Sequence, residues 1–371
     1  MKVLVFPKDV TNPYQELLYG PMRKQHTVTY LTAQFNNPFR SATYVLRLLA
    51  RLLQRRTQGY RILHVHWLHT LTVPDFVPFA KHIAFLQTSL FLSWARLLGY
   101  RLVWTAHNVL PHATITSNDL AIRRKLSRSA AAIIVHSTST IAALASHGLN
   151  TKVCQLIPHG SYIGVYPNTL ILQQARKKLR LPRTAKVITF FGAIHSYKNV
   201  PELVSAFLVV ARKNSDVYLL IAGRCKDENL LLAVATAQEA VGDRIRLYDA
   251  FIPDDDIQLY LNAADVCAFP FTEITTSGSV LLAASFGKPI VAPYIGALQD
   301  MPKSIGKLYN PTTKTALSSA LTNVLSHDKE RLAMAEASLQ YAQSLDWYTI
   351  ASQTVGVYVR INTVAAAPHE R

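Results

Sequence analysis

The 371-residue chain is half hydrophobic and only 16% charged, which favours two packed domains of about 150–200 residues and argues against a disordered polypeptide. Its three cysteines show no paired spacing, so neither a disulfide framework nor a zinc–cysteine site is expected. The net charge of +17 is concentrated in residues 1–168, where 18 Lys/Arg face four acids, and only +3 remains for the rest. So basic a half predicts an anionic partner: nucleic acid, acidic lipid headgroups or a diphosphate-bearing substrate.

Predicted strands alternate with predicted helices through the first half, which indicates a parallel α/β sheet. The strands are expected at Lys2–Phe6, Thr27–Leu31, Ile62–His66, Leu102–Thr105, Ala132–His136 and Lys152–Ile157. Because Met1-Lys2 leads directly into the first of them, we expect no signal peptide.

Two segments of the first half are candidates for a membrane surface. Residues 41–56 form a basic amphipathic helix, in which arginines alternate with leucines. Residues 76–98 are almost wholly apolar, but Pro78, Lys81 and Gln87 interrupt them and leave roughly 17 residues, the lower limit for crossing a bilayer. We therefore expect 76–98 to be a helix that is buried in the core or lies on a membrane, without crossing it.

The second half repeats the alternation after an irregular, basic linker at 169–185. Strands are expected at Lys186–Phe191, Val217–Ala222, Ile245–Leu247, Asp265–Pro270 and Ile290–Ala292, and helices at 313–343 and Trp347–Ile361. Between the last two strands, the turn Ser277-Gly278-Ser279 opens an apolar helix. Backbone N–H groups at such a helix start bind phosphate, although Ser277 or Ser279 could equally be a simple N-cap.

Histidines cluster where three first-half strands end. They are His64, His66 and His69, then His107 and His112, then His159. The carboxyl ends of parallel strands share one edge of the sheet, so these side chains could form an active-site wall, although each could also be a structural residue. No His-x3-His helix or carboxylate partner supports zinc, and the three acids Asp254–Asp256 are explained by capping of a helix.

The turn after the strand Lys186–Phe191 reads Gly192-Ala193-Ile194-His195-Ser196-Tyr197-Lys198. Its lysine could supply a point charge to a diphosphate. A dinucleotide oxidoreductase is disfavoured, because Gly-x-Gly-x-x-Gly follows no predicted strand.

These motifs resemble those of two-domain glycosyltransferases of the GT-B architecture, broadly of the family-4 type, and within it the xanthan-type exopolysaccharide β-mannosyltransferases. The shared residues are Asn12-Pro13-Tyr14, His64-x-His66-Trp67, His107-Asn108-x-x-Pro111-His112, His159-Gly160-x-Tyr162, Tyr197-Lys198 and Ser277-Gly278. The chain departs from the family at Leu282, where a ribose-binding Glu would stand, and at His195, which replaces an Arg of nearer relatives.

The resemblance implies two Rossmann-like doubly wound domains that face a central cleft. The first, 1–168, would face the acceptor and the membrane, and the second, 186–343, would bind the nucleotide sugar. Residues 344–371 would be a helix that packs back on the first domain.

The resemblance also implies an enzyme: an inverting glycosyltransferase, without metal or other cofactor, that moves mannose from GDP-mannose to a polyprenyl-diphosphate-linked glycan in exopolysaccharide synthesis. It would be cytoplasmic and peripheral on the inner face of the plasma membrane, attached through residues 41–56 and 76–98. The alternatives are a retaining UDP-sugar transferase and a non-catalytic protein that binds an anionic surface or nucleic acid. Alternation of arginine with leucine rather than with aromatic residues favours lipid over nucleic acid.

Three sets of site residues follow. The catalytic base is expected among His107, His66 and Asp9. Donor binding is assigned to His195, Tyr197, Lys198, Glu273, Thr276, Ser277, Gly278 and Ser279. Acceptor binding is assigned to Asn12, Tyr14, Trp67, Asn108, His112 and His159.

Overall fold

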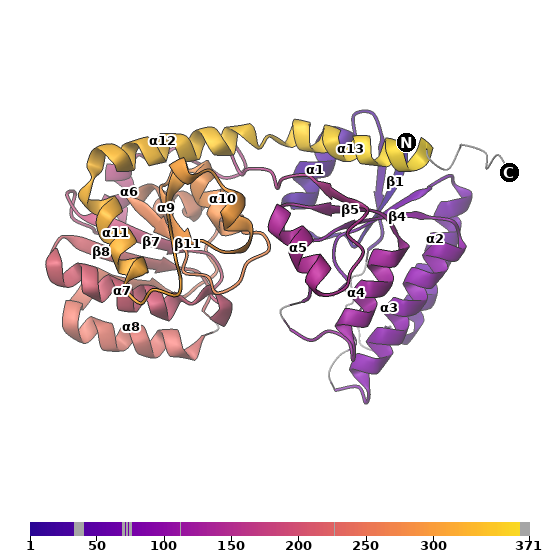
Figure 1. Cartoon of the computed structure of the whole chain (residues 1–371), viewed down its shortest axis with the longest axis horizontal. Coiled ribbons are helices and arrows are strands. Elements are labelled where there is room, and N and C mark those ends of the chain that lie inside the picture. The colour runs from indigo at the N-terminus through magenta and orange to yellow at the C-terminus, as the bar shows by residue number, and fades with distance from the viewer. Residues whose placement is uncertain are drawn as a thin grey trace. The chain divides into compact units, whose positions relative to one another are not determined.

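The computed structural model describes residues 1–32, 41–68, 71, 73, 76–111, 113–225 and 227–363, with the side chains of 41–43 left out; His69 and His112 lie outside these ranges. The chain forms two compact units (Figure 1). One contains Met1–Gly160 together with Trp347–Arg371, and the other contains Ser161–Asp346. The expected linker, 169–185, therefore lies in the second unit, where it contains the helix α6 (Leu172–Lys178).

The first unit is built on a six-stranded parallel sheet in the order β2-β1-β3-β4-β5-β6. Its strands are β1 (Lys2–Phe6), β2 (Thr27–Tyr30), β3 (Ile62–Val65), β4 (Arg101–Thr105), β5 (Ala130–Val135) and β6 (Cys154–Leu156). Its helices are α1 (Tyr14–Met22), α2 (Ser41–Thr57), α3 (Ala80–Leu97), α4 (Asp119–Ser129), α5 (Thr138–Ser146) and α13 (Trp347–Thr363).

Alternate residues of these strands face two different cores, because successive side chains of a strand point to opposite faces. Leu4 and Phe6 pack into the core that also takes residues of α2, α3 and α4. Val3 and Val5 face the core shared with α1 and α13, which pack on each other. Ile62 belongs to this second core, so His64, two residues later on β3, points to the side of α1 and α13.

The two segments predicted to lie on a membrane are helical, α2 and α3. Part of the apolar face of α2, however, faces the core of the unit. Val45, Leu48 and Leu52 of α2 are buried in the core. These side chains are therefore not available to a membrane. Leu46 and Leu53 of α2 are exposed, and so are Leu86, Leu90 and Leu97 of α3. Among the helices of the described ranges, none is long and apolar enough to span a bilayer.

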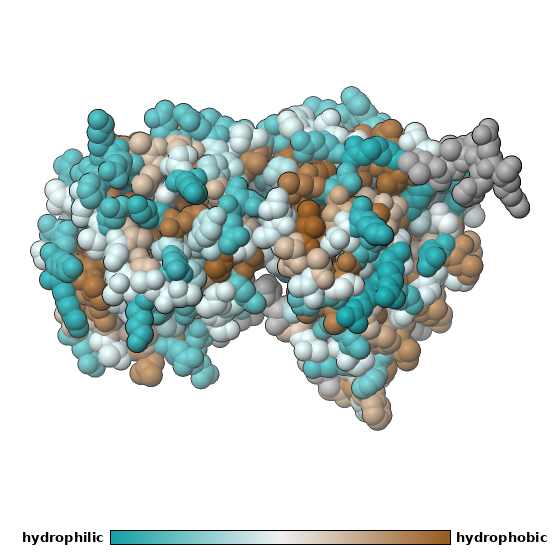
Figure 2. All heavy atoms as spheres, viewed as in Figure 1, coloured by the Kyte–Doolittle hydropathy of each residue, from teal (hydrophilic) through white to brown (hydrophobic). Residues whose placement is uncertain are grey.

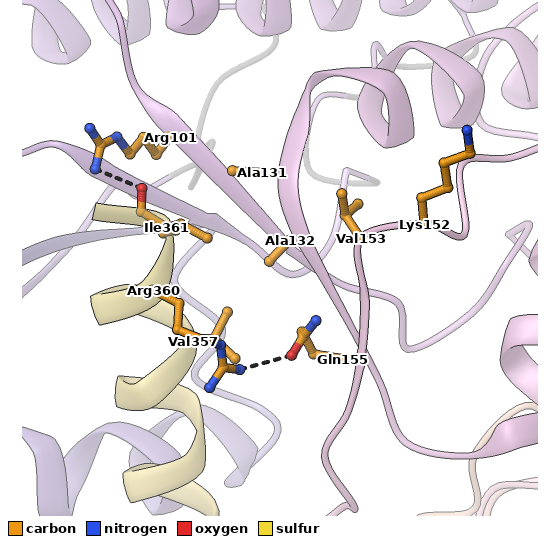
Figure 3. A pocket seen from close by; sticks show the side chains of 9 residues that line it. All are labelled: Arg101, Ala131, Ala132, Lys152, Val153, Gln155, Val357, Arg360 and Ile361. Carbon is orange, nitrogen blue, oxygen red and sulfur yellow. Dashed lines mark hydrogen bonds between the residues drawn. The ribbon is translucent and has the colours of Figure 1, made fainter. Parts of the chain in front are cut away.

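A cavity of about 450 Å³ lies beside the start of β4, β5 and β6, under the end of α13 (Figure 3). Arg101 donates to the carbonyl of Ile361 at 2.7 Å, and Arg360 donates to Oε1 of Gln155 at 2.8 Å. Both bonds tie α13 to the amino-end edge of the sheet. The cavity is thus at the edge opposite to the one where the histidines cluster.

The second unit contains a parallel sheet in the order β12-β11-β10-β7-β8-β9. Its strands are β7 (Lys186–Phe191), β8 (Val217–Ala222), β9 (Ile245–Tyr248), β10 (Val266–Ala268), β11 (Ile290–Pro293) and β12 (Gly306–Tyr309). Its helices are α6, α7 (Val200–Lys213), α8 (Glu228–Val241), α9 (Ile257–Ala263), α10 (Gly278–Ser285), α11 (Ala316–Ser326) and α12 (Asp328–Ser344). The sequence pattern did not predict α6, α8 or β12, and the single helix expected over 313–343 is two helices that divide at His327.

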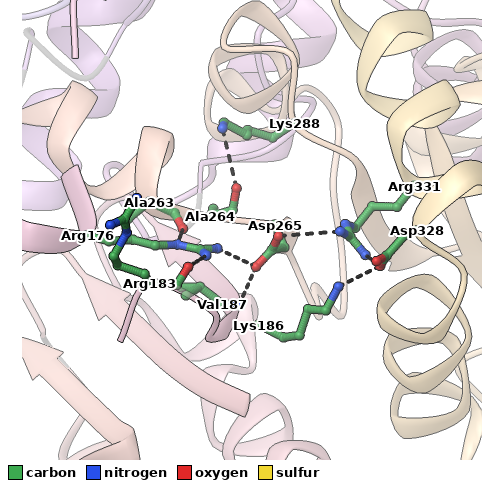
Figure 4. A network of polar contacts seen from close by, with 10 residues as sticks. All are labelled: Arg176, Arg183, Lys186, Val187, Ala263, Ala264, Asp265, Lys288, Asp328 and Arg331. Atoms are coloured by element: carbon green, nitrogen blue, oxygen red, sulfur yellow. Dashed lines mark hydrogen bonds and ion pairs between the residues drawn. The ribbon is translucent and has the colours of Figure 1, made fainter. Parts of the chain in front are cut away.

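A buried ion pair holds this second sheet to its helices (Figure 4). Arg176 of α6 donates to Oδ2 of Asp265 at 2.6 Å, and both side chains are almost fully buried. The same oxygen accepts the backbone N–H of Val187 on β7 at 2.7 Å, and Arg331 of α12 lies 3.7 Å from the other oxygen. Asp265 therefore joins α6, β7 and α12 just before β10 begins.

Candidate active sites

In the first unit, a continuous chain of hydrogen bonds joins histidines and tyrosines. Nδ1 of His64 lies 2.7 Å from the hydroxyl of Tyr19 and 2.6 Å from that of Tyr358, and Nε2 lies 2.7 Å from the hydroxyl of Thr105. The tyrosines come from α1 and α13, and the alternation of side chains along β3 places His64 on the face of the sheet that these two helices cover. His64 is fully buried, and every polar atom of its ring has a partner.

The chain continues from Tyr19 towards the carboxyl end of β4. The hydroxyl of Tyr19 is 2.7 Å from Nε2 of His66, and Nδ1 of His66 is 3.1 Å from Nε2 of His107. Both ring nitrogens of His66 are thus occupied inside the protein. The ring of His107 is partly exposed, and the ring of Trp67 stacks on it at a centroid distance of 4.5 Å.

Two further histidines, His136 and His159, complete this histidine–tyrosine cluster around the buried ring of Tyr14. Tyr14 contacts the rings of both, at 5.7 and 5.1 Å, and that of His107 at 4.7 Å. Nδ1 of His136 donates to the carbonyl of Ile157 at 2.8 Å, which leaves its buried Nε2 without a partner. Sequence reasoning did not assign His136 to the site, although it follows β5 directly, as His66 follows β3.

The histidines of this cluster are uncharged near neutral pH. Burial, reinforced by the neighbouring His136, lowers the pKa of His64 and of His159 to about 3, and burial lowers the pKa of His136 to about 4. Burial and neighbouring imidazoles also hold the pKa values of His66 and His107 well below their usual range. An uncharged imidazole can accept a proton.

Some predicted residues have other roles in the structure. Oδ1 of Asp9 accepts the backbone N–H and the hydroxyl of Thr11, and Oδ1 of Asn12 accepts the N–H of Tyr14, so both side chains shape the loop after β1. Tyr14 is buried among rings, and so is His159, whose Nδ1 lies 2.7 Å from the carbonyl of Gly160. Asn108 follows His107 in the same loop and is partly buried.

In the second unit, Lys198 is the centre of a separate cluster, the lysine cradle, which consists of Gly192, Lys198 and Ser279. Lys198 ends a short 3-10 turn (Ser196–Lys198) after β7, and its side chain is 9% exposed. Its Nζ lies 5.8 Å from the ring centroid of Phe190 and 5.9 Å from that of Phe271. Burial in this apolar setting lowers the pKa of Lys198 to about 8.

Gly192 brings the lysine next to the start of α10. Its φ is +125°, and a Cβ there would lie 2.5 Å from Oγ of Ser279 and 3.4 Å from Nζ of Lys198. Only glycine leaves this space open. Ser277 is the N-cap, and its Oγ accepts the N–H of Val280 at 3.2 Å. The capping role that the sequence left open for Ser277 is therefore real, and Ser279 is the hydroxyl that faces the lysine.

The loops around the lysine cradle are held by local bonds. Thr272 donates its N–H to the carbonyl of Tyr197 at 2.9 Å, which ties the loop of Glu273 to the lysine turn. The carboxylate of Glu273 contributes to a raised pKa of Tyr197, after burial, and the ring of His195 stacks on Tyr197 at 5.9 Å. Oγ1 of Thr276 is buried without a partner.

Tyr162 is a further residue that sequence reasoning did not assign to the site. A Cβ on Gly278 would lie 2.9 Å from its hydroxyl, so the phenol stands at the first residue of α10. Burial raises the pKa of Tyr162, which keeps the phenol protonated as a donor. Across the described residues, no group of three or more His, Cys, Asp or Glu could hold a metal ion.

Residues 185–327, which contain the lysine cradle, match the family model "Glycosyl transferases group 1". The chain is 30% identical over 208 residues to a D-inositol 3-phosphate glycosyltransferase of Corynebacterium urealyticum, covering 54% of this chain and 49% of that one. It is 23% identical over 243 residues to the GDP-mannose:glycolipid 4-beta-D-mannosyltransferase of Xanthomonas campestris, covering 63% and 62%. The chain spans about half the length of the corynebacterial relatives that it matches.

Solved structures extend the likeness of fold to both units. Sucrose-phosphate synthase from Thermosynechococcus elongatus has a TM-score of 0.76 at 17% identity and covers 99% of both chains. Anabaena HepE, in complex with UDP and glucose, has a TM-score of 0.75 at 16% identity, covering 97% of this chain and 100% of its own. The chain has the GT-B fold, and its residues 185–327 match the group 1 glycosyl transferase model. This supports the predicted fold class and the expectation of a nucleotide-sugar-dependent enzyme.

Proposed function

We propose that the protein is a glycosyltransferase that moves a sugar from a nucleoside-diphosphate donor to a carbohydrate acceptor. The observation that carries the proposal is the lysine cradle inside the group 1 domain. It combines a buried ammonium, a serine hydroxyl at a helix start and a glycine without which the space would close. Fixed donors of this kind stabilise a diphosphate whose negative charge grows as the glycosidic bond breaks.

The proposed donor-site roles follow from these positions. Lys198 contributes charge, while Ser279, Gly278 and the hydroxyl of Tyr162 contribute hydrogen bonds to the leaving diphosphate. The unpartnered hydroxyl of Thr276 is a further candidate contact. His195, Tyr197 and Glu273 line the neighbouring turns and would contact the nucleoside or sugar. No step of this scheme requires a metal.

For the acceptor, His107 is the proposed base. The acceptor oxygen bonds to the anomeric carbon, the bond from that carbon to the diphosphate oxygen breaks, and the hydroxyl proton passes to Nδ1 of His107. For Nδ1 to accept, the proton of neutral His107 must sit on Nε2 and be donated to His66. His66 then donates from Nε2 to Tyr19, which donates to His64. When all these hydrogen bonds point in this direction, Nδ1 of His107 carries no proton and can accept one.

Trp67, stacked on His107, is the proposed platform for an acceptor sugar. His66 acts through His107 in this scheme and is a positioning residue. Asp9 ranks below His107 as a base, because Oδ1 of its carboxylate accepts two hydrogen bonds from Thr11.

The donor identity is a separate proposal. GDP-mannose is favoured by the motif resemblance and by likeness to the Xanthomonas mannosyltransferase, whose name also suggests a glycolipid acceptor such as a polyprenyl-diphosphate-linked glycan. A UDP-sugar is the second candidate, because HepE was crystallised with UDP-glucose. An acceptor anchored in a bilayer would place the enzyme on the inner face of the plasma membrane, where the exposed apolar side chains of α3 could dock.

A thermal-stability screen with UDP- and GDP-sugars tests the donor proposal. A ligand at 100 times its Kd raises the free energy of unfolding by about 2.7 kcal/mol, which is a readily measured shift in Tm. Stabilisation by one nucleotide class that is lost in Lys198→Met would support the donor site. Absence of stabilisation by any nucleotide sugar would contradict it.

A further inference from the structure

A basic groove lies between α3 and α4 of the first unit, with a volume of about 330 Å³. We call it the α3–α4 groove. It is lined by Ser93 and Arg96 of α3 and by Ala121, Arg124, Lys125, Arg128 and Ser129 of α4. Four of these seven residues are cations, and two of the others carry hydroxyl groups.

The ion pairs of the described residues leave the positive charge of the groove unbalanced. Among the described residues, no carboxylate forms an ion pair with any of the four cations. Lys125 donates to the hydroxyl of Ser89 at 2.6 Å, and Arg124 reaches the carbonyl of His147 only at 3.4 Å. Four cations around one groove repel one another, so an anion bound there relieves an existing electrostatic cost.

An apolar stripe runs along α3 directly beside this groove. Its residues are Phe79, Leu86, Leu90 and Leu97, which are 79%, 65%, 47% and 74% exposed. The helical period of 3.6 residues places Leu86, Leu90 and Leu97 on one narrow face, next to the side that carries Ser89, Ser93 and Arg96, and Phe79 is the N-cap residue just before the helix. In Figure 2, hydrophilic residues gather over α4 and hydrophobic ones lie beside them over α3.

We propose that the α3–α4 groove binds the phosphate of an anionic phospholipid head group, while the acyl chains of that lipid lie against the apolar stripe of α3. Guanidinium groups form paired hydrogen bonds to phosphate oxygens, and the two serine hydroxyls can donate as well. A free phosphate ester would use only the groove, and a neutral membrane only the stripe. The adjacency of the two favours a molecule that is anionic at one end and apolar at the other.

This site differs from the surface that the arginines of α2 suggested. Three of the apolar residues on that helix are in the core, and two others, Leu46 and Leu53, are 64% and 46% exposed. Helix α2 therefore offers both charge and apolar area, but the cations that line a groove are those of α3 and α4. The arginines of α2 provide diffuse attraction, whereas α3 and α4 provide a defined site. The proposal does not depend on the donor site, and its test requires no sugar transfer.

Flotation with vesicles compares two triple variants that remove the same charge. Vesicles of phosphatidylcholine, with and without phosphatidylglycerol, are mixed with the parent protein, with Arg96→Gln/Arg124→Gln/Arg128→Gln and with Arg47→Gln/Arg51→Gln/Arg55→Gln. Each cation near a leaflet accounts for roughly a fivefold change in partitioning, so the groove variant should bind roughly 100-fold more weakly. The α2 variant should stay within about tenfold of the parent.

Equal losses in the two variants would show that only total charge matters and would overturn the groove. Equal binding of the parent protein to both vesicle types would also overturn it. Urea unfolding of both variants checks that these exposed substitutions leave the fold intact. Lys198→Met should float like the parent protein, which separates this test from the donor site.

A second experiment separates a lipid from a free anion. Monomeric short-chain phosphatidylglycerol should raise the Tm of the parent protein at lower concentration than glycerol phosphate does. Leu90→Ser/Leu97→Ser should remove that advantage without changing the response to glycerol phosphate. If the lipid and glycerol phosphate act equally on the parent protein, the groove takes a soluble phosphate ester and the proposal fails. A DNA oligonucleotide that displaces the protein from vesicles and loses affinity in the groove variant would also overturn it.

Discussion

Replacing Lys198 by methionine should make the unliganded protein more stable while strongly weakening donor binding. Methionine keeps the length of the side chain and removes the charge. The pKa of Lys198 falls from its usual value of about 10.5 to about 8 because the ammonium is buried beside Phe190 and Phe271. The gap between these values corresponds to about 3 kcal/mol of free energy, spent on holding the charge in the native state near pH 7. Removal of the charge should recover most of it.

Stability and donor affinity should respond to pH in opposite directions. Between about pH 8 and pH 10.5 the unfolded chain holds more protons at Lys198 than the native state, so the free energy of unfolding should rise with pH across that window. Donor affinity should fall over the same window, because the neutral amine no longer attracts a diphosphate. Both dependences should disappear in Lys198→Met. Its donor affinity near pH 7 should be about 100-fold weaker, equivalent to about 2.7 kcal/mol.

Urea unfolding and calorimetric titration with the nucleotide sugar, each at several pH values, measure these quantities. Lys288→Met is the matched control, because burial also lowers the pKa of Lys288, but its ammonium donates to the carbonyl of Ala264. That variant should change stability and leave donor affinity near the parent value. If Lys198→Met bound the donor normally, or if both lysine variants lost binding equally, the assignment of the donor site would be wrong.

Three further substitutions test other parts of the structure. Asp265→Ala should lower the free energy of unfolding by about 3 kcal/mol or more in urea titrations, because it leaves the buried guanidinium of Arg176 unpaired; a loss below about 1 kcal/mol would mean that the network is replaceable. Gly192→Ala should cost at least about 1 kcal/mol of stability from its φ of +125° and weaken donor binding in titrations, whereas unchanged binding would place the diphosphate elsewhere. Tyr19→Phe should shift the ¹⁵N resonances of His107 towards the other tautomer and lower kcat more than it raises KM; unchanged resonances would remove Tyr19 and His66 from the preparation of the base.

Much of the fold follows from local pattern. The strands β1, β3, β4, β7 and β8 are buried apolar runs with clear ends, and their polar residues follow at the carboxyl edge, where parallel strands present them together. The lysine turn and the serine start of α10 were found for the same reason: each lies in the loop that follows a buried strand. Helix α6 and strand β12 were missed because neither carries a strong apolar period; β12 is only partly buried, and α6 is fixed by the distant pairing of Arg176 with Asp265.

The roles inside the sites needed the tertiary structure. His64, His66 and His107 looked alike in the sequence, yet of these three only His107 is partly exposed. The hydroxyl of Tyr19 bonds to the rings of both His64 and His66, and that of Tyr358 bonds to His64, so these two histidines are held inside the unit. Tyr358 is 294 residues from His64, a separation across which no local pattern can indicate contact. On α2, the sequence determined by itself that the helix is amphipathic. Whether its leucines face a membrane or a core depends on a neighbouring helix, and that is decided only when the whole unit packs.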